Sequence, residues 1–405
     1  MSEPKPVNQS RWASLETILR ENYENPGIEA AKVFYSVVAA HSIEDYSPCW
    51  LLLIAPSGSM KTDLIESLRG LPNVHLKDEV TAKTFISSQL EEGRVRKQSA
   101  SLLHRMGSNG ILAVADFSTF TCQDPKTLKT VLAQLRRIYD GNYSREFGTD
   151  ENLEDREWTG RLTFIAGATP DVDRHYRIFQ LMGERFVRLR MPRAGGIKPG
   201  LKALSHRKTL LPSLREAVSN LFSALPKKEE CVPPSISPEM SERIVAATEL
   251  VCLARAYVQR ENGNREMVCE PSPEGNTRLP QQVAQLGRGW ALLNGRPTLG
   301  EEEFQLVQRA CLDSIPPDRR QVLAAVENGA SPYSLHLPNG SVTRGIEDLK
   351  SVGLLANTEI GFRLADNVKP LIFQAVGSSH FFSRCNLVGE DRKTAPRLLA
   401  ESGNS

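Results

Sequence analysis

Several short apolar runs, separated by stretches with helical spacing, restrict the fold of this 405-residue chain more than any other feature. The run at 50–55 (WLLLIA) contains no polar residue after its tryptophan, as in a strand with both faces buried. Further strands are expected at 73–76, 110–116, 161–168 and 186–191, with a helix over 125–139. Strands that alternate with helices predict a parallel α/β sheet.

The sequence changes in character after about residue 200, where helical spacing replaces the apolar runs. Prolines are frequent between residues 224 and 238, as in a linker or a long loop. We expect an N-terminal helical segment (1–44), an α/β core (45–200), an α-helical block (201–312), a small domain (313–376) and a flexible basic tail (377–405). The tail contains Arg384, Arg392, Lys393 and Arg397.

The overall charge and the cysteine pattern argue against several classes of protein. The net charge is +2, so any site for a polyanion must be local. The apolar runs are too short to cross a bilayer, which argues against a membrane partner, and the polar start of the chain lacks the apolar core of a signal peptide. The seven cysteines form no Cys-x-x-Cys pair, which indicates a reduced, cytoplasmic protein without a zinc finger.

The segment between the first strand and the next helix has the pattern of a phosphate-binding loop. It consists of Ala55 followed by Pro56, Ser57, Gly58, Ser59, Met60, Lys61 and Thr62. In such a loop backbone N–H groups face a phosphate, a lysine approaches the terminal phosphates and a hydroxyl coordinates Mg²⁺. Lys61 and Thr62 fit these roles, although Met60 puts a side chain where the backbone must approach the phosphates. The alternative is a strand, turn and helix that bind nothing.

Two further positions follow strands of the same predicted sheet. Asp116 ends the strand at 110–116, where a carboxylate holds Mg²⁺ directly or through a water. Thr169 follows the strand at 161–168, where a hydroxyl orients an attacking water. The alternatives are a carboxylate that caps the next turn and an ordinary turn before Pro170. The order and spacing of the three elements favour the nucleotide site.

Taken in this order, the loop, the strand that ends in Asp116 and the segment 161–170 (RLTFIAGATP) resemble AAA+ P-loop ATPases. The stretch 139–148 (YDGNYSREFG) looks like the β-hairpin before the sensor-one strand in the clade of minichromosome-maintenance helicases and sigma-factor activators. Phage and mobile-element ATP-binding proteins share this hairpin. The resemblance covers about residues 45–310. It implies a three-layer α/β/α parallel sheet with an α-helical lid, ATP and Mg²⁺ as cofactors, and a homo-oligomeric ring.

The resemblance also assigns two arginines. Arg185, in the stretch 181–186 (LMGERF), is similar to the arginine finger that acts on a neighbouring subunit's nucleotide. We expect it at a sheet edge near a subunit boundary, and an internal ion pair is the alternative role. Arg174 and Arg177 are alternative fingers. Arg278 is similar to the sensor-two arginine of the lid and is expected to bind the nucleotide.

One position departs from the family's pattern. The family usually has a glutamate after the strand-end aspartate, where it polarises the attacking water. Phe117 stands there in this chain. Glu79 and Glu146 are both candidates for a substitute carboxylate. Nucleotide binding with slow or partner-triggered turnover is therefore the expected behaviour.

Two regions carry features of nucleic-acid binding. In the hairpin, Tyr143, Arg145 and Phe147 combine aromatic and basic side chains that suit a single strand, although an ordinary surface hairpin is the alternative. The basic run at 94–97 is read as a solvated loop. Residues 313–376 read as helix, second helix and hairpin, similar to a winged helix. Its second helix offers Arg344 and Lys350 to DNA, but also carries acidic residues, so a protein partner is equally compatible.

These observations leave three functions open. The first is a DNA-dependent ATPase, either a helicase-like or a helicase-loading motor of a phage or mobile element. The second is a nucleotide-binding regulator or adaptor whose winged helix docks DNA or a protein. The third, a P-loop kinase, is disfavoured by the lid-like helical block.

Overall fold

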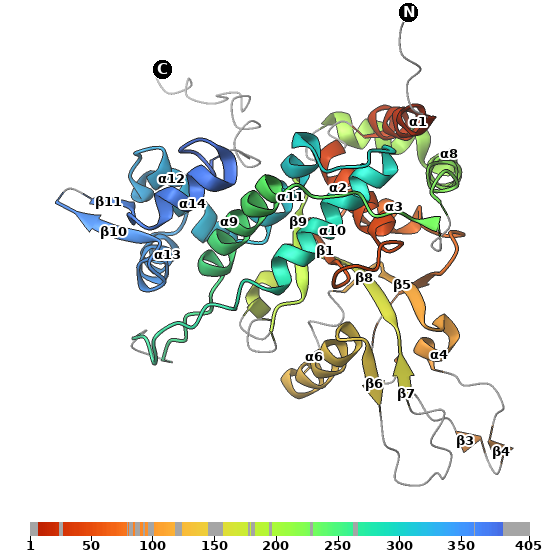
Figure 1. Ribbon diagram of the computed structural model, residues 1–405, viewed down its shortest axis with the longest axis horizontal. Coiled ribbons are helices and arrows are strands. Elements are labelled where there is room, and N and C mark those ends of the chain that lie inside the picture. Colours follow the sequence, from red (N-terminus) through yellow and green to blue (C-terminus); the bar gives the residue numbers. More distant parts are fainter. Residues whose placement is uncertain are drawn as a thin grey trace, which may run out of the picture.

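The computed structural model describes residues 7–23, 27–78, 80, 84–85, 90–91, 94–95, 101–117, 124–144, 157–176, 179, 183–193, 197–226, 230–261, 266–359 and 361–383. At its centre is an all-parallel sheet of five strands, β2-β5-β8-β1-β9 (Figure 1). The strands are β1 (Trp50–Ile54), β2 (Val74–Lys77), β5 (Asn109–Val114), β8 (Arg161–Ala168) and β9 (Phe186–Arg190). Each expected strand is present, and the expectation for β8 matches at both ends. The strand expected to reach Asp116 ends two residues earlier, at Val114.

Both faces of the sheet are buried, which explains the continuous apolar runs. In β1, Leu51 and Leu53 belong to the core on one face, while Trp50, Leu52 and Ile54 belong to the core on the other. The parallel register pairs β1 with β8 on one side and with β9 on the other, so the carboxyl ends of the strands lie along one edge.

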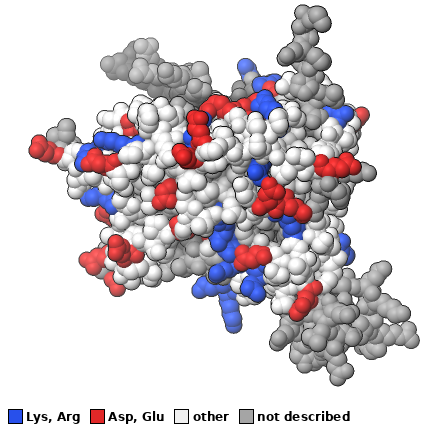
Figure 2. Space-filling view, in the orientation of Figure 1, with Lys and Arg blue, Asp and Glu red and all other residues white. Residues whose placement is uncertain are grey.

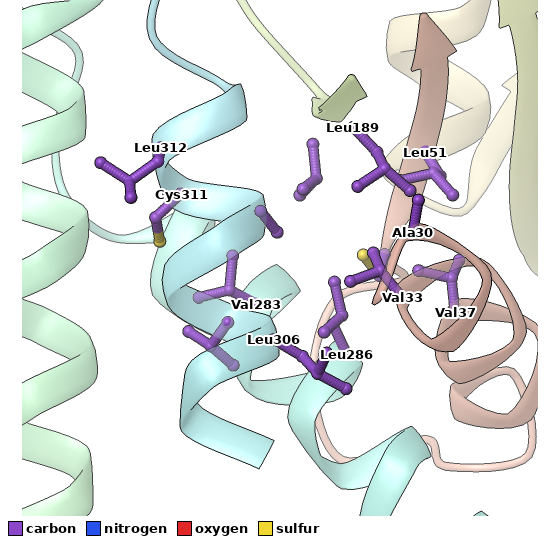
Figure 3. Close-up of a cluster of buried hydrophobic side chains, with 14 of the residues drawn as sticks. Ala30, Val33, Val37, Leu51, Leu189, Val283, Leu286, Leu306, Cys311 and Leu312 are labelled. Atoms are coloured by element: carbon purple, nitrogen blue, oxygen red, sulfur yellow. The ribbon is translucent and has the colours of Figure 1, made fainter. Parts of the chain in front are cut away.

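The helices on the first face pack as one body with the sheet. They are α1 (Val7–Asn22), α2 (Ile28–Ala40), α3 (Lys61–Glu66), α8 (Ile197–Phe222), α9 (Pro238–Ala254), α10 (Arg278–Leu293) and α11 (Glu301–Asp313). Figure 3 shows side chains of α2, α10 and α11 packed around Leu51 of β1 and Leu189 of β9. Gly289 permits the close crossing of α10 and α2, because a Cβ there would lie 1.9 Å from the Ser36 carbonyl oxygen. Among the described residues no separate core marks the boundary expected at residue 200.

The opposite face carries α4 (Leu102–Met106) and α6 (Pro125–Tyr139). The Asp124 side chain caps α6 by accepting hydrogen bonds from the N–H groups of Lys126 and Thr127, both at 3.0 Å. The helix leads into a two-stranded antiparallel hairpin, β6 (Asn142–Ser144) and β7 (Glu157–Thr159). A second short pair is formed by β3 (Leu90–Glu91) and β4 (Arg94–Val95). Helices therefore cover both faces, which is compatible with a three-layer α/β/α arrangement.

The C-terminal part contains the two expected helices and the hairpin in the expected order. They are α12 (Pro317–Glu327), α13 (Asn339–Ser351) and the strands β10 (Leu355–Thr358) and β11 (Gly361–Leu364). The 3₁₀ turn η4 (Pro332–Ser334) and a further helix, α14 (Val368–Val376), complete this part. The last helix packs against α9 and ties this part to the helical block. Within the described ranges, no helix is long and apolar enough to cross a membrane.

The segment 377–383 corrects one expectation. We expected the flexible tail to start at residue 377, but Phe381 and Phe382 are fully buried. The carboxylate of Glu327 at the end of α12 accepts hydrogen bonds from the N–H groups of Phe381, Phe382 and Ser383, at 2.6, 3.1 and 2.8 Å. Residues 384–405, with the basic residues expected there, lie outside the described part of the chain.

Candidate functional site

The loop after β1 has an open, tightly turned backbone. Gly58 has φ +76, a conformation that glycine adopts without steric strain. Ser59 closes the turn, because its hydroxyl donates a hydrogen bond to the Pro56 carbonyl at 2.8 Å. Ser57 and Gly58 at the tip are exposed. The loop can therefore present backbone groups to a ligand.

Met60 does not stand beside the ligand space, contrary to our expectation. Its side chain is 4% exposed and belongs to the same apolar core as Leu64 and Ile65 of α3. The side chain therefore points into the protein and anchors the end of the loop. A glycine is not required at this position, since the Met60 side chain leaves the outer side of the loop clear.

Lys61 is held in a defined place by its neighbours. Its side chain is 7% exposed, and its stem lies against Gly167 of β8, where a Cβ would be 3.1 Å from Lys61 Cδ. Burial lowers the pKa of the Lys61 ammonium, while the Asp116 carboxylate acts in the opposite direction. Gly167 is a site residue that the sequence did not reveal. The pattern of a strand does not show which of its residues a lysine from another segment will pack against.

The three predicted elements of the nucleotide site meet at the carboxyl edge of the sheet. β8 lies between β5 and β1 in the sheet. Asp116 follows β5, Thr169 follows β8 and the phosphate loop follows β1, so the three segments leave neighbouring strands at the same edge. The N–H of Phe117 donates to the Gly167 carbonyl at 2.6 Å, and the N–H of Ala55 donates to the Ala168 carbonyl at 3.0 Å. These bonds fix the segments after β5 and β1 against β8.

The donor groups at this edge fit an Mg²⁺–nucleotide complex. The Thr62 and Asp116 side chains are exposed, and Asp116 is close enough to Lys61 for their charges to interact. Mg²⁺ in phosphate-binding proteins takes one or two protein oxygens and completes its shell with phosphate oxygens and waters. A hydroxyl and a carboxylate beside a lysine match that requirement.

Phe117 is a core residue. It is fully buried, and its ring lies 5.7 Å from that of Phe164 and 6.1 Å from that of Phe186. This position therefore cannot supply a base to a water at the site. Both substitutes considered from the sequence, Glu79 and Glu146, lie outside the described residues.

Arg278, which the resemblance assigns to nucleotide binding, lies away from the phosphate loop of its own chain. Its guanidinium donates to the Glu184 carbonyl at 3.1 Å, directly before β9. β9 begins at Phe186, which pairs with Trp50 at the start of β1, whereas the loop follows the end of β1. The strand length between these ends is about 16 Å.

Arg185 lies at the same amino edge of the sheet and is buried, at 6% exposed. It donates to the Gly183 carbonyl at 2.9 Å and forms an ion pair with Asp140 at 3.5 Å. Burial, followed by the positive charge of Arg278, lowers the pKa of the Arg185 guanidinium. Within a single chain, the contacts of Arg185 therefore match its alternative role, an internal ion pair.

Of the two other finger candidates, Arg174 is exposed and pairs with Asp171 at 3.0 Å. Arg177 lies outside the described residues. Neither alternative gains support from these positions.

Of the three hairpin residues expected to contact a single strand, the structure describes Tyr143, and it is not placed as expected. Tyr143 is 7% exposed, pairs with Trp158 across β6 and β7, and packs in the core beneath the sheet. It is therefore not available for stacking on a base in this structure. Arg145 and Phe147 lie outside the described residues.

Arg344 and Lys350 are both exposed on α13, as a DNA-contacting role requires. The acidic residues of this helix are engaged elsewhere: Glu347 pairs with Arg260 at 3.0 Å, and Asp348 pairs with Arg319 at 2.9 Å. The helix is therefore less acidic toward solvent than its sequence indicates. Arg344 also lines a cleft of about 530 Å³ with Arg260, Glu266 and Met267.

No protein-family model matches the chain, and a search of curated proteins finds no relative.

Proposed function

We propose that this chain is an ATP-binding protein of the AAA+ kind that acts on DNA, as a helicase-like or helicase-loading motor. The observation that carries the proposal is the position of Lys61. Its stem is held on Gly167, its charge is beside Asp116, and the exposed tip of the loop precedes it at the carboxyl edge of a parallel sheet. In open α/β sheets this edge is where ligands bind.

Each residue then has a distinct role. The backbone of residues 56–60 surrounds the phosphates, and the Lys61 ammonium neutralises the terminal ones. Thr62 and Asp116 hold Mg²⁺, which when bound neutralises charge on the phosphates. Thr169 orients a water toward the terminal phosphate.

The amino edge of the sheet supports the proposed ring. Arg185 and Arg278 lie together there, and the guanidinium carbons are 5.4 and 5.8 Å from the centre of the Tyr139 ring. These arginines lie at the opposite edge of the sheet from the phosphate loop of their own chain. In the proposed ring they would contact the nucleotide bound to a neighbouring subunit. Such groups stabilise the charge that develops during phosphoryl transfer.

The second candidate is a nucleotide-binding regulator or adaptor with little turnover. The observation that favours it is the burial of Phe117 at the position where the AAA+ ATPases that the sequence resembles usually have a glutamate. Hydrolysis measured with and without single- and double-stranded DNA separates the two functions. A rate that rises with DNA supports the motor, and strand displacement would secure it.

The phosphate site is tested with Lys61→Ala. Losing a charge-assisted contact of about 1.5–3 kcal/mol should weaken ATP binding by about 10- to 150-fold, measured by calorimetry with Mg²⁺. Lys369→Ala is the matched control, because Lys369 is an exposed lysine in the C-terminal helix α14. Equal ATP affinity in folded Lys61→Ala and in the control would show that the loop does not bind phosphate.

A further inference from the structure

The exposed face of α6 carries an unusual concentration of positive charge. Its four cations are exposed, and the helix contains no acidic residue. They are Lys126, Lys129, Arg136 and Arg137. We call them the α6 stripe, since their spacing places them along one side of the helix. In Figure 2, Lys and Arg side chains protrude where Figure 1 draws α6.

Among the described residues, the cations of the α6 stripe differ from most arginines in having no carboxylate partner. Arg188, Arg190 and Arg309, for example, each form an ion pair with a carboxylate within 3.0 Å. Within the part of the chain that the structure describes, no carboxylate lies within ion-pair distance of the four stripe residues. With a net charge of only +2 for the whole chain, this is a local excess.

The stability of the helix does not account for the stripe. Arg136 and Arg137 lie in the last turn, where cations interact favourably with the helix dipole. Lys126 and Lys129 lie near the start, where the dipole disfavours them, and at a spacing of three they also repel each other. Residues that act against local stability are expected where a function requires them.

The residues around the stripe favour one kind of partner. The apolar side chains of α6, such as Leu128, Leu132 and Leu135, are buried beneath it. Thr130 and Ala133 are the exposed small residues between the cations. A protein partner or a lipid surface usually buries large apolar side chains at the centre of its contact. The stripe offers charge without such side chains, which suits a phosphodiester backbone.

The dimensions also fit. From Lys126 to Arg137 the helix rises about 16 Å, which corresponds to about five phosphates of one strand at 3.4 Å each. The helix continues through Gly141 into β6, so the stripe adjoins the hairpin β6–β7 (Figure 1). We propose that the α6 stripe is a binding site for the backbone of a nucleic acid. Such binding is independent of base sequence and requires no nucleotide.

The test uses the full chain without ATP and measures fluorescence anisotropy of labelled single- and double-stranded 30-mers over a range of salt. The variant Lys126→Gln/Lys129→Gln/Arg136→Gln/Arg137→Gln should bind at least about 100-fold more weakly at low salt. The slope of log affinity against log salt should fall by about 3, for four lost phosphate contacts. The two probes distinguish which form of nucleic acid the stripe prefers.

Arg344→Gln/Lys350→Gln is the matched control, because it removes two exposed cations from the rival helix α13. Loss of binding in this control with full binding by the α6 variant would overturn the proposal. Equal competition by polyglutamate and by nucleic acid would also overturn it in favour of an acidic protein partner. The inference rests on the proposed function only in expecting the nucleic acid to be DNA. The two proposals can fail separately. Loss of nucleic-acid binding tests the α6 stripe, whereas the ATP affinity of the same variant reports on the phosphate site at Lys61.

Discussion

At the scale of single residues, Gly167 shows how closely the candidate site is packed. A Cβ at this position would lie 2.6 Å from the Ala115 carbonyl oxygen and 3.1 Å from Lys61 Cδ. Gly167→Ala should therefore displace both the strand end before Asp116 and the stem of Lys61. We expect a loss of about 1–3 kcal/mol in the free energy of unfolding together with weaker ATP binding, measured by urea denaturation and calorimetry.

Gly340→Ala is the control for this change. Gly340 lies in α13, and a Cβ there would meet no atom within 4 Å. This substitution should leave stability unchanged or raise it slightly. If Gly167→Ala matched the control in both stability and ATP affinity, the close packing of Lys61 on β8 would not matter for the site.

The sequence predicted which residues follow the strands, but not where every side chain points. Lys61, Asp116 and Thr169 could be brought together from strand order alone, because parallel strands share a carboxyl edge. Met60 and Tyr143 could not be placed in this way. Met60 is turned into the core by the backbone at the end of its loop, and Tyr143 is buried by its cross-strand pairing with Trp158. Both directions depend on contacts that no local pattern contains.

Among the elements, the edge strand β9 is held by charge as well as by packing. Arg188 of β9 is 1% exposed and pairs with Glu184 at 2.9 Å and with Asp173 of η2 (Pro170–His175) at 3.0 Å. Arg190 pairs with the same Asp173 at 2.7 Å, and its N–H donates to Asp313 of α11. These bonds connect the segment after β8, the edge strand β9 and the helix α11.

Removing Glu184 should be costly, because it would leave Arg188 buried with a single, partly exposed partner. We expect Glu184→Gln to lower the free energy of unfolding by about 3–5 kcal/mol. Asp171→Asn breaks the exposed pair with Arg174 and should cost at most about 1 kcal/mol. Chemical denaturation of the two variants compares them directly. Similar small losses in both would mean that the pair at Glu184 contributes little to holding β9.

Element positions followed from local patterns wherever the contacts are local. The bounds of β8 and of α6 were both predicted from local sequence patterns. The segment 377–383 was missed, because its order depends on Glu327, which is 54 residues from Phe381 in the sequence. The strand before Asp116 was predicted too long, since Ala115 continues the apolar pattern after the strand has ended.

At the scale of the whole molecule, the two edges of the sheet carry complementary halves of the proposed mechanism. The phosphate loop follows the carboxyl end of β1, while Arg185 and Arg278 lie at the amino end of β9. Because one chain cannot bring both ends to a single nucleotide, the proposed catalysis would require two subunits. This arrangement is our reason, besides the resemblance, for proposing a ring.

Mixing variants tests this arrangement. Arg278 is only half-buried, so Arg278→Ala should keep the fold and the ATP affinity while hydrolysis falls by about 10³-fold or more, as when an arginine finger is lost. Arg185→Ala should act in the same direction but also lower the melting temperature, because Arg185 is buried and paired with Asp140. Mixed with Lys61→Ala subunits, each arginine variant should regain part of the activity, since some interfaces then combine an intact loop with intact arginines. Thermal melts of each variant and sedimentation with ATP and DNA accompany the assay. Two results would contradict trans action: a chain that stays monomeric under those conditions, or a folded Arg278→Ala variant whose lost activity no mixture restores.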